Sequence, residues 1–405
     1  MAKIEAARGR IIEDSRGEKT IEIDLLSRGR EFKSSVPSGK SRGKFEAKPI
    51  APEKALESLE RVMRAAGKKD FATQREFDDF LLNLDGTPDK SNLGANLTLA
   101  LSISFARLLA NNENLPLYEF LRRQSAGASS SFPRLLFNLI NGGLHVSVSD
   151  TPLPFQEYLV VPKTNSPEEA LKTGFEFIET LKGVLAPRGE ADRFGDEGGF
   201  VVSGLDPELG LELLDDARRV YGDRVDLSID AAASSLWDAR ENIYKWRSQT
   251  WTGEELLKIY EWIIKRYGLL SIEDPFDEER MEEWQKLSRE RGGVWIIGDD
   301  LTVTNVERIK KAAQAQAASG VIIKPNQIGT VSETISAVNL ARQFDWKVIV
   351  SHRSGETDDD FIADLAYGIG ADGLKSGSPL QSERLVKYKR LVQIEKSLRQ
   401  EINKQ

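Results

Sequence analysis

The sequence predicts an α/β protein in which a (β/α)₈ barrel follows a smaller α+β domain. Short apolar runs between Leu227 and Lys375 end, one after another, in a charged or polar residue, as buried strands do where they reach the rim of a barrel. Amphipathic segments separate the runs, so strand and helix alternate with a period of about 25 residues. The chain has 405 residues, which exceeds a barrel of about 250 and leaves roughly 130 for a second domain.

The ends of the predicted strands carry charged side chains of both signs. The carboxyl ends of barrel strands converge on one face. The residues expected to meet there are Asp230, Glu273, Asp299, Lys324, His352, Arg353 and Lys375. Any one of them alone is equally well explained as a helix cap or a solvated charge, but the recurrence of acids at the same point of successive units favours a site. Three carboxylates in a partly buried site repel one another unless a hard cation neutralises them, so the pattern predicts a divalent metal.

Composition narrows the class of partner. The chain has 56 basic and 64 acidic residues, a net charge of −8, which argues against nucleic acid and anionic membranes as default partners. No apolar run approaches the roughly 18 residues needed to span a bilayer. Cysteine is absent, and the first residues lack the apolar core of a signal peptide. We therefore expect a soluble, cytoplasmic protein that acts on a small molecule.

The smaller domain is expected over residues 1–123, with a linker at 124–131 and the barrel at 132–405. Alternating apolar and polar residues predict two antiparallel strands at Lys3–Ile12 and Thr20–Leu26, and a third strand that ends at Val36. Helical patterns follow at Pro52–Ala66, Gln74–Leu84, Asn92–Ala110 and Leu117–Arg122. Asn92 has the character of a helix cap.

Residues 37–44 are too rich in glycine, serine and basic side chains for a packed element. A mobile loop is predicted. It is either a plain hairpin connection or a lid over an anionic ligand, and its composition alone does not decide between the two.

The opening of the barrel holds further candidates for chemistry. His145 follows a glycine turn, Gln156 and Glu157 precede a strand, and Glu197 lies in a glycine-rich acidic turn. A lone histidine is more often structural than catalytic, and acidic glycine turns are common, so each signal is weak by itself. In the barrel region, helices are expected at Glu254–Tyr267, Asn305–Ala318, Thr330–Phe344 and Ser382–Ile402, the last closing the barrel.

Many ordered motifs of the sequence resemble those of the enolases, the phosphopyruvate hydratases of glycolysis, along nearly the whole chain. The matching motifs are Asp14–Gly17, Val36–Gly39, Gly94–Asn96, Asn141–Gly143 with His145, Gln156–Glu157, Gly195–Gly199, Glu273–Phe276, Gly298–Asn305, Lys324 with Asn326–Thr330, Ser351–Thr357, Lys375–Gly377 and Ser382–Arg384. The resemblance implies an N-terminal α+β capping domain and a barrel of ββαα(βα)₆ order, whose first two strands are antiparallel.

The resemblance also implies the reaction, the reversible Mg²⁺-dependent dehydration of 2-phosphoglycerate to phosphoenolpyruvate through a metal-stabilised enediolate. Lys324 resembles the base that takes the C2 proton, and Glu197 the acid that assists loss of the C3 hydroxyl. The implied ligands of two Mg²⁺ ions are Asp230, Glu273, Asp299 and, in the lid, Ser41. The implied substrate-binding residues are His145, Gln156, Glu157, Lys324, His352, Arg353, Ser354 and Lys375. A homodimer or a dimer-based oligomer is also implied.

Some positions depart from the family pattern. Glu18 and Lys19 replace the usual Asn-Pro of the first hairpin, Lys40 and Arg42 replace small or neutral lid residues, and Gln381 stands where arginine is common. None of these changes removes a catalytic group. Two alternatives stay open at this point: a related superfamily enzyme that acts on another carboxylate, and an enolase-like binding protein without activity.

Overall fold

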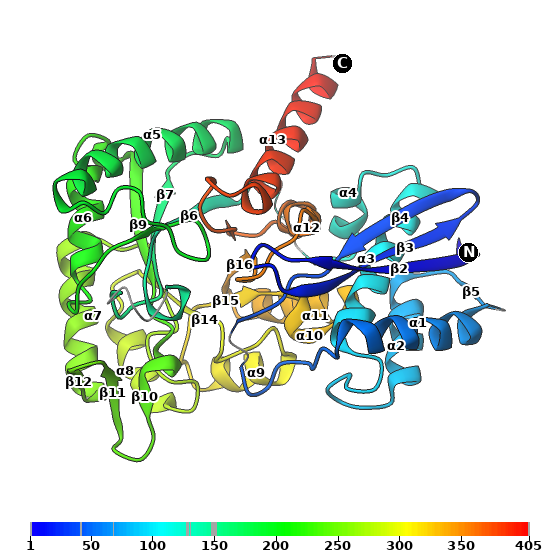
Figure 1. Cartoon of the computed structure of the whole chain (residues 1–405), viewed down its shortest axis with the longest axis horizontal. Helices are drawn as coiled ribbons and strands as arrows, with labels where there is room; N and C mark the ends of the chain where they lie inside the picture. Colours follow the sequence, from blue (N-terminus) through cyan, green and yellow to red (C-terminus); the bar gives the residue numbers. More distant parts are fainter. Residues whose placement is uncertain are drawn as a thin grey trace.

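The computed structural model describes residues 2–40, 43–67, 69–126, 129, 131–146 and 152–403. In Figure 1 the chain forms two parts side by side, with the N-terminal elements on the right and the barrel in the centre and on the left. None of the described helices combines the length and apolar character needed to cross a membrane.

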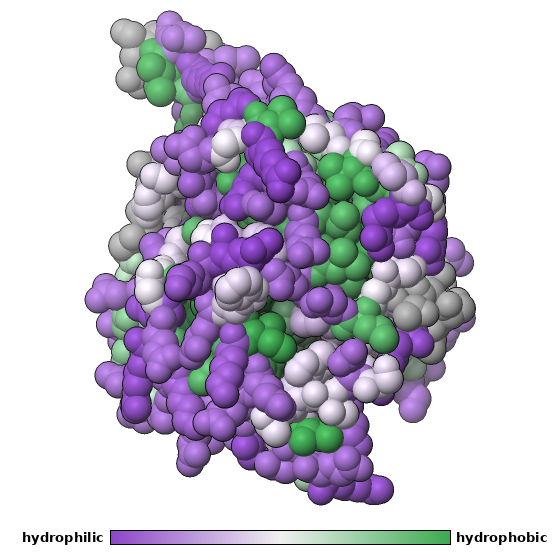
Figure 2. All heavy atoms as spheres, turned by 90° about the vertical axis from the view of Figure 1, so that its left-hand side faces the viewer, coloured by the Kyte–Doolittle hydropathy of each residue, from purple (hydrophilic) through white to green (hydrophobic). Residues whose placement is uncertain are grey.

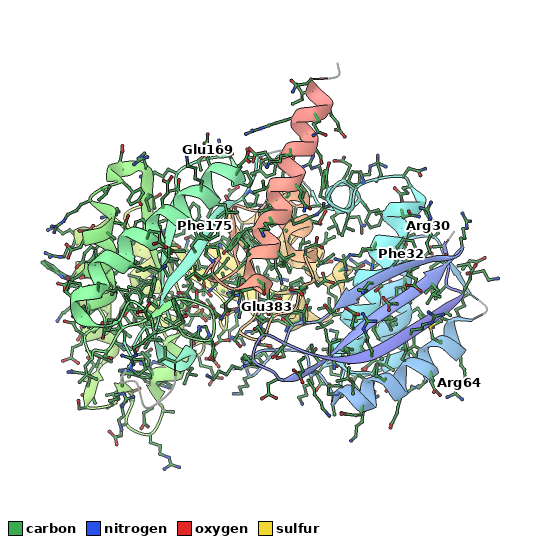
Figure 3. The ribbon with its side chains drawn as sticks, turned by 45° about the horizontal axis from the view of Figure 1, so that its top comes forward. Arg30, Phe32, Arg64, Glu169, Phe175 and Glu383 are labelled. Carbon is green, nitrogen blue, oxygen red and sulfur yellow. The ribbon has the colours of Figure 1, made fainter. Side chains whose placement is uncertain are left out.

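The N-terminal part packs helices against a small antiparallel sheet. Its strands are β1 (Ala2–Lys3), β2 (Ala6–Glu13), β3 (Lys19–Ser27), β4 (Arg30–Ser35) and β5 (Asp70–Phe71), and its helices are α1 (Pro52–Ala66), α2 (Gln74–Asp85), α3 (Ala95–Asn112) and α4 (Leu117–Arg122). Strands β2, β3 and β4 form the sheet, while β1 pairs with β5. Every second residue of β3 is fully buried, at Ile21, Ile23 and Leu25, because one face of the sheet lies on the helices. Figure 3 shows β4, with Arg30 and Phe32, beside these helices.

Eight strands close the barrel. They are β6 (Arg134–Asn141), β7 (Glu157–Pro162), β9 (Val225–Asp230), β13 (Ser271–Glu273), β14 (Trp295–Gly298), β15 (Gly320–Ile323), β16 (Lys347–Ser351) and β17 (Gly373–Lys375). Strand β7 runs antiparallel to both neighbours, the later strands are parallel, and β17 pairs with β6 to complete the circle. A short strand, β8 (Phe200–Val201), pairs in parallel with Ile140 and Asn141 at the end of β6. The predicted ββαα(βα)₆ order is confirmed.

Helices surround the barrel and cover its apolar strands. They are α5 (Pro167–Leu185), α6 (Leu209–Arg218), α7 (Gly253–Tyr267), α8 (Met281–Glu290), α9 (Val306–Gln314), α10 (Pro325–Ile328), α11 (Val331–Gln343), α12 (Phe361–Gly368) and α13 (Ser382–Ile402). A three-stranded sheet of β10 (Trp237–Asp238), β11 (Ile243–Trp246) and β12 (Gln249–Trp251) is inserted before α7. A separate apolar cluster, which includes Leu136, Ile297 and Ile322, fills the interior of the barrel.

One detail of the predicted helices is wrong. Asn92 does not cap α3, which begins at Ala95 after Gly94; its side-chain amide instead donates to the carbonyl oxygen of Asp85 at 2.7 Å. Helix α13 has the predicted extent and packs between α12 and α5, so it closes the ring of helices as predicted, while β17 pairs with β6 to close the ring of strands. The helix starts near Glu383, in the middle of the molecule, and ends away from both parts (Figures 1 and 3).

Polar contacts fix the N-terminal part to the barrel. Arg107 of α3 forms an ion pair with Asp359 at 2.8 Å, and Lys90 forms one with Glu333 at 2.8 Å. The buried carboxylate of Asp78 accepts a hydrogen bond from the backbone N–H of Ser332 at 2.9 Å. The domain limits stay a prediction, and residues 127, 128 and 130 of the expected linker lie outside the described residues.

Much of the surface is charged. Figure 2 shows the face at the left of Figure 1, which is mainly hydrophilic and carries separate apolar patches. This agrees with a chain of which 30% of the residues are charged. A cavity at the rim of the barrel is lined by most of the predicted site residues.

Candidate active site

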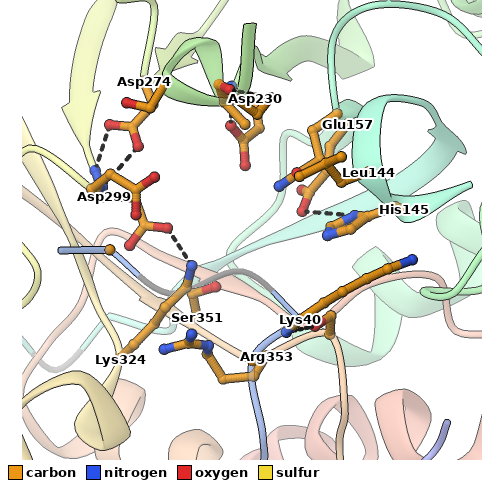
Figure 4. Close-up of a pocket in the computed structure, with 18 of the residues that line it drawn as sticks. Lys40, Leu144, His145, Glu157, Asp230, Asp274, Asp299, Lys324, Ser351 and Arg353 are labelled. Carbon is orange, nitrogen blue, oxygen red and sulfur yellow. Dashed lines mark hydrogen bonds and ion pairs between the residues drawn. The ribbon is translucent and has the colours of Figure 1, made fainter. Parts of the chain in front are cut away.

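A cavity of about 300 Å³ opens where the barrel strands end, beneath the segment of the N-terminal part that reaches Lys40. The predicted site residues that line it are His145, Gln156, Glu157, Glu197, Asp230, Asp299, Lys324, His352, Arg353, Ser354 and Lys375. Figure 4 shows Asp230, Asp274 and Asp299 on one side and Lys324, Arg353 and Lys40 on the other. The structure therefore gathers nearly all the predicted residues at one place.

Lys375 lies among three buried carboxylates. Its ammonium nitrogen is 2.7 Å from Glu273, 3.1 Å from Asp230 and 3.3 Å from Glu157. Burial raises the pKa of Glu273 well above its usual range, and the charge of Asp230 adds to this effect. The second oxygen of Glu273, Oε1, is buried and has no hydrogen-bond partner among the described residues. One lysine therefore serves three carboxyl groups, and burial favours the protonated form of Glu273.

Asp299 is held in place from three sides. Its carboxylate forms an ion pair with Lys324 and accepts a hydrogen bond from the side-chain amide of Gln327 at 2.8 Å. Its backbone N–H donates to Asp274 at 2.8 Å. Asp274, Asp299 and Asp300 each offer an oxygen within 4.8 Å of the others. Among the described residues this is the one group of three that consists of acids alone and lies within that distance, and it includes one of the three predicted metal ligands.

Lys324 follows β15 and is protonated in this arrangement. Burial, Arg353 and Lys375 all act to lower its pKa, but Asp299 outweighs them and the net pKa is raised. Asp299 is thus the group that keeps Lys324 charged. A cation or another group that binds Asp299 would weaken its ion pair with Lys324, and the pKa of Lys324 would then fall toward the neutral form that a base requires.

Glu197 reaches the cavity from the opposite side of the barrel. Its Oε2 accepts a hydrogen bond from Asn138 of β6 at 3.0 Å and lies 3.3 Å from Nε2 of His352. Its Oε1 lies 3.6 Å from Nε2 of His145. Burial acts to raise the pKa of Glu197, but the neighbouring His145 and His352 more than offset this and hold it well below its usual range. From β15 to β6 is three steps around the sheet, so Lys324 and Glu197 approach the cavity from different walls.

Arg353 provides positive charge at another wall. It forms an ion pair with Glu46 of the N-terminal part at 2.9 Å and donates to Asn326 at 3.1 Å. The side chains of Arg353 and Glu46 are each only 6% exposed. Next to them, the hydroxyl oxygen of Ser354 accepts a hydrogen bond from the backbone N–H of Lys40 at 2.8 Å.

The segment predicted to be a plain connection or a lid, residues 37–44, contacts two loops of the barrel through its described residues. Ser38 and Gly355 exchange backbone hydrogen bonds of 2.8 and 2.9 Å. The ammonium of Lys40 lies 2.8 Å from Asp196, next to Glu197. A Cβ at Gly355 would lie 2.0 Å from an oxygen of Asp14, so only glycine permits this close approach. The predicted metal ligand Ser41, with Arg42, lies outside the described residues.

Sequence reasoning missed several residues that orient the predicted ones. Glu46, Asp274 and Gln327 hold Arg353 and Asp299, and Asn138 holds Glu197. Asn138 left a signal, because a polar residue interrupts an otherwise apolar strand. Glu46 left none, since it pairs with a residue 307 positions away.

The chain is similar to known enolases over almost its full length. The model of the N-terminal domain of enolase matches residues 4–121, and the model of the C-terminal TIM barrel domain of enolase matches residues 129–404. The enolase of Mastigamoeba balamuthi is 39% identical, covering 98% of this chain and 96% of its own length.

Relatives from other lineages agree with this finding. Enolase B of Dictyostelium discoideum is 38% identical over 98% of this chain and 95% of its own length. The enolase of Methanococcus vannielii is 37% identical over 96% of this chain and 94% of its own length. With both domain models matched in order and relatives aligned from end to end, the chain belongs to the enolase family of phosphopyruvate hydratases, which are lyases.

Proposed function

We propose that this enolase dehydrates 2-phosphoglycerate to phosphoenolpyruvate with Lys324 as the base and Glu197 as the acid. One observation carries the assignment: a largely buried lysine, with 14% of its side chain exposed, and a buried carboxylate face the same cavity of about 300 Å³ from different walls. Removal of a C2 proton and loss of a C3 hydroxyl require a base and an acid at two neighbouring carbon atoms. Of the described residues, Lys324 and Glu197 fit these positions best.

Family membership implies a divalent metal, and we propose Mg²⁺ held by Asp230, Glu273 and Asp299. The buried carboxylates and the unpartnered Oε1 of Glu273 fit a hard cation, which prefers oxygen ligands. When bound, the cation supplies positive charge beside the substrate carboxylate and so favours the charge that develops as the C2 proton leaves. Asp274 would help to hold this ligand set through its hydrogen bonds to the backbone of Asp299 and Asp300.

Lys324 takes the C2 proton onto its amine nitrogen in the proposed reaction. It must first be neutral, and the ion pair with Asp299 opposes this. Burial, Arg353 and Lys375 favour the neutral form, so Lys324 becomes a base when Asp299 is engaged elsewhere. Lys375 stays positive, since its carboxylate neighbours raise its pKa despite its burial, and it stabilises the negative charge on the substrate carboxylate.

Glu197 gives a proton to the C3 hydroxyl, which leaves as water while the C2–C3 double bond forms. The carboxylate is ionised in the substrate-free arrangement, so the proton must be acquired as the site fills. Glu157 lies in the same buried group as Glu197 and His145. Burial keeps the pKa of Glu157 well above its usual range. A protonated neighbour of this kind is suited to share a proton with Glu197.

The phosphate end of the substrate is assigned to Arg353, Ser354 and His145, with Gln156 lining the same cavity. Arg353 already has Glu46 as a partner. A phosphate must therefore either displace Glu46 or share the guanidinium with it. Ser41 remains proposed as the ligand of a second Mg²⁺. A homodimer or dimer-based oligomer and a cytoplasmic location also remain predictions.

Formation of phosphoenolpyruvate, followed by its ultraviolet absorbance, tests the proposed function. We expect turnover of 2-phosphoglycerate with Mg²⁺ and none after EDTA is added. No turnover with Mg²⁺ would refute the proposal and favour either an inactive binding protein or an enzyme for another carboxylate. In the latter case, proton exchange should appear with a carboxylate that lacks the phosphate.

A further inference from the structure

Arg384 is fully buried and is not among the residues that line the cavity of the site. It lies in the first turn of α13, and its guanidinium donates to the carbonyl oxygens of Arg353, Ser354 and Asp196. The Ser354 and Asp196 contacts measure 2.7 and 3.3 Å. These three carbonyl groups belong to the two loops that carry His352 and Glu197. One side chain therefore ties the two loops together.

The guanidinium also contacts the imidazole of His352. The distance between the guanidinium nitrogen and Nδ1 of His352 is 2.5 Å. Arginine can only donate hydrogen bonds, so Nδ1 must accept and cannot carry a proton. Burial lowers the pKa of His352 to about 4, and the charge of Arg384 adds to this effect. The ring is therefore neutral near pH 7, with its single proton on Nε2.

The protonated Nε2 faces Glu197. Its distance to Oε2 of Glu197 is 3.3 Å, and Asn138 donates to the same oxygen at 3.0 Å. Two donors on Oε2 leave Oε1 as the oxygen that can hold the transferable proton. Gly377 permits this packing, because a Cβ there would lie 3.1 Å from both Arg384 and His352 and 3.0 Å from the backbone oxygen of Glu197.

We propose that Arg384 is a positioning residue that fixes His352 as the Nε2–H tautomer, and that His352 thereby directs the proton-carrying oxygen Oε1 of Glu197 toward the substrate. The role of His352 is then to donate a hydrogen bond to Glu197 as a neutral group, in place of the substrate contact expected from the sequence. The part that concerns proton transfer rests on the proposed role of Glu197, whereas the tautomer does not depend on any activity.

The tautomer can be measured in the unmodified protein. The chain has only two histidines, so ¹⁵N spectra of a histidine-labelled sample show two rings, and a His145→Gln sample identifies the ring of His352. At pH 7 we expect an unprotonated Nδ1 and a protonated Nε2 for His352. A proton on Nδ1, or on both nitrogens, would overturn the proposal whether or not the protein turns over 2-phosphoglycerate.

The Arg384→Lys variant tests whether Arg384 is the residue that fixes the tautomer of His352. Lysine keeps the charge but cannot reach the same set of acceptors, so His352 should show both neutral tautomers and kcat should fall about tenfold or more, a usual cost of losing an orienting partner. Arg390→Lys is the matched control, because Arg390 lies on the same helix and forms an ion pair with Asp364 at 2.7 Å. In this variant the tautomer of His352 and the kcat should be unchanged.

The two readouts separate positioning from folding. If Arg384→Lys lowers kcat and the melting temperature while His352 stays entirely Nε2–H, Arg384 has a merely structural role and the proposal fails. If this variant does not fold, the spectrum of the unmodified protein still decides the tautomer.

Discussion

The ammonium nitrogen of Lys375 lies 2.7 Å from Oε2 of Glu273, while Oε1 of the same carboxylate is buried without a hydrogen-bond partner among the described residues. A buried carboxyl group needs hydrogen-bond partners for its oxygen atoms. Lys375 contacts only one of the two oxygens of Glu273, and the same ammonium nitrogen also lies 3.1 Å from Asp230. We therefore propose that a cation binds beside this pair.

Metal binding should depend on this carboxylate. A ligand that binds only the folded state stabilises it, by about 2.7 kcal/mol at a hundredfold excess over Kd, so Mg²⁺ should raise the melting temperature of the unmodified enolase. In Glu273→Gln the metal-induced rise and the activity should both be lost while the barrel stays folded. Glu241→Gln, at an exposed acid on the inserted sheet, should retain both. An undiminished rise in Glu273→Gln would mean that the cation binds elsewhere.

The lid lysine should affect substrate capture. Lys40 reaches Asp196 at 2.8 Å, with the two side chains 42% and 31% exposed. Exposed pairs of this kind contribute at most about 1 kcal/mol, so Lys40→Ala should change kcat/KM by about fivefold or less. The larger effect should be a weaker dependence of kcat/KM on ionic strength, since salt screens exposed charges.

Lys44→Ala is the control for the lid lysine. Lys44 lies 3.2 Å from Glu279, with both side chains 63% exposed, and it does not line the cavity. Its loss should leave the salt dependence close to that of the unmodified protein. An equal change in both variants would show that the lid senses net charge only and that Lys40 has no particular role.

Asp78 should make the stability depend on pH. Burial raises its pKa to about 6 in the folded protein, against about 3.9 in an unfolded chain. Between these values the folded state keeps a proton that the unfolded state has lost, so the free energy of unfolding decreases as pH rises from about 4 to about 6. At about 1.4 kcal/mol per pKa unit, the loss is about 3 kcal/mol at most.

Replacement of Asp78 isolates this contribution. Asp78→Asn should remove this part of the slope, so that urea denaturation shows the variant gaining on the unmodified protein between pH 4.5 and pH 7. Asp79→Asn, at an exposed position on the same helix, should keep the original slope. Parallel curves for Asp78→Asn and the unmodified protein would show that this carboxyl does not hold a proton in the folded state.

The barrel was predictable because its signals are local. A buried strand needs an apolar run, and the residue that follows the run is necessarily at the rim; Asp230 and Lys324 were located in this way. The start of the helix expected at Asn305–Ala318 was predicted to within one residue: α9 begins at Val306, after Asn305, whose side chain accepts hydrogen bonds from the backbone of Glu307 and Arg308. The same reasoning was wrong at Asn92, because Asp85 and Asn92 bind each other in a turn that precedes the helix.

Contacts between distant segments were not predictable from patterns. Glu46 meets Arg353 only because the N-terminal part folds over the barrel, and no spacing in the sequence records that contact. The resemblance to enolases located Arg384 in a motif but gave it no role. The role that we propose for Arg384 follows from the folded structure, in which its guanidinium donates hydrogen bonds to two loops that are distant in the sequence.

Proton exchange at C2 tests the central claim, the division of labour between Lys324 and Glu197. In deuterated solvent with Mg²⁺, NMR of recovered 2-phosphoglycerate reports whether the C2 proton has exchanged. Glu197→Gln retains the base, so it should still exchange this proton while its dehydration rate falls by about 10²–10⁴-fold, the usual contribution of a general acid. Lys324→Ala should lose both exchange and dehydration, because it removes the proposed base. Exchange that survives in Lys324→Ala but disappears in Glu197→Gln would contradict the account and reverse the two roles.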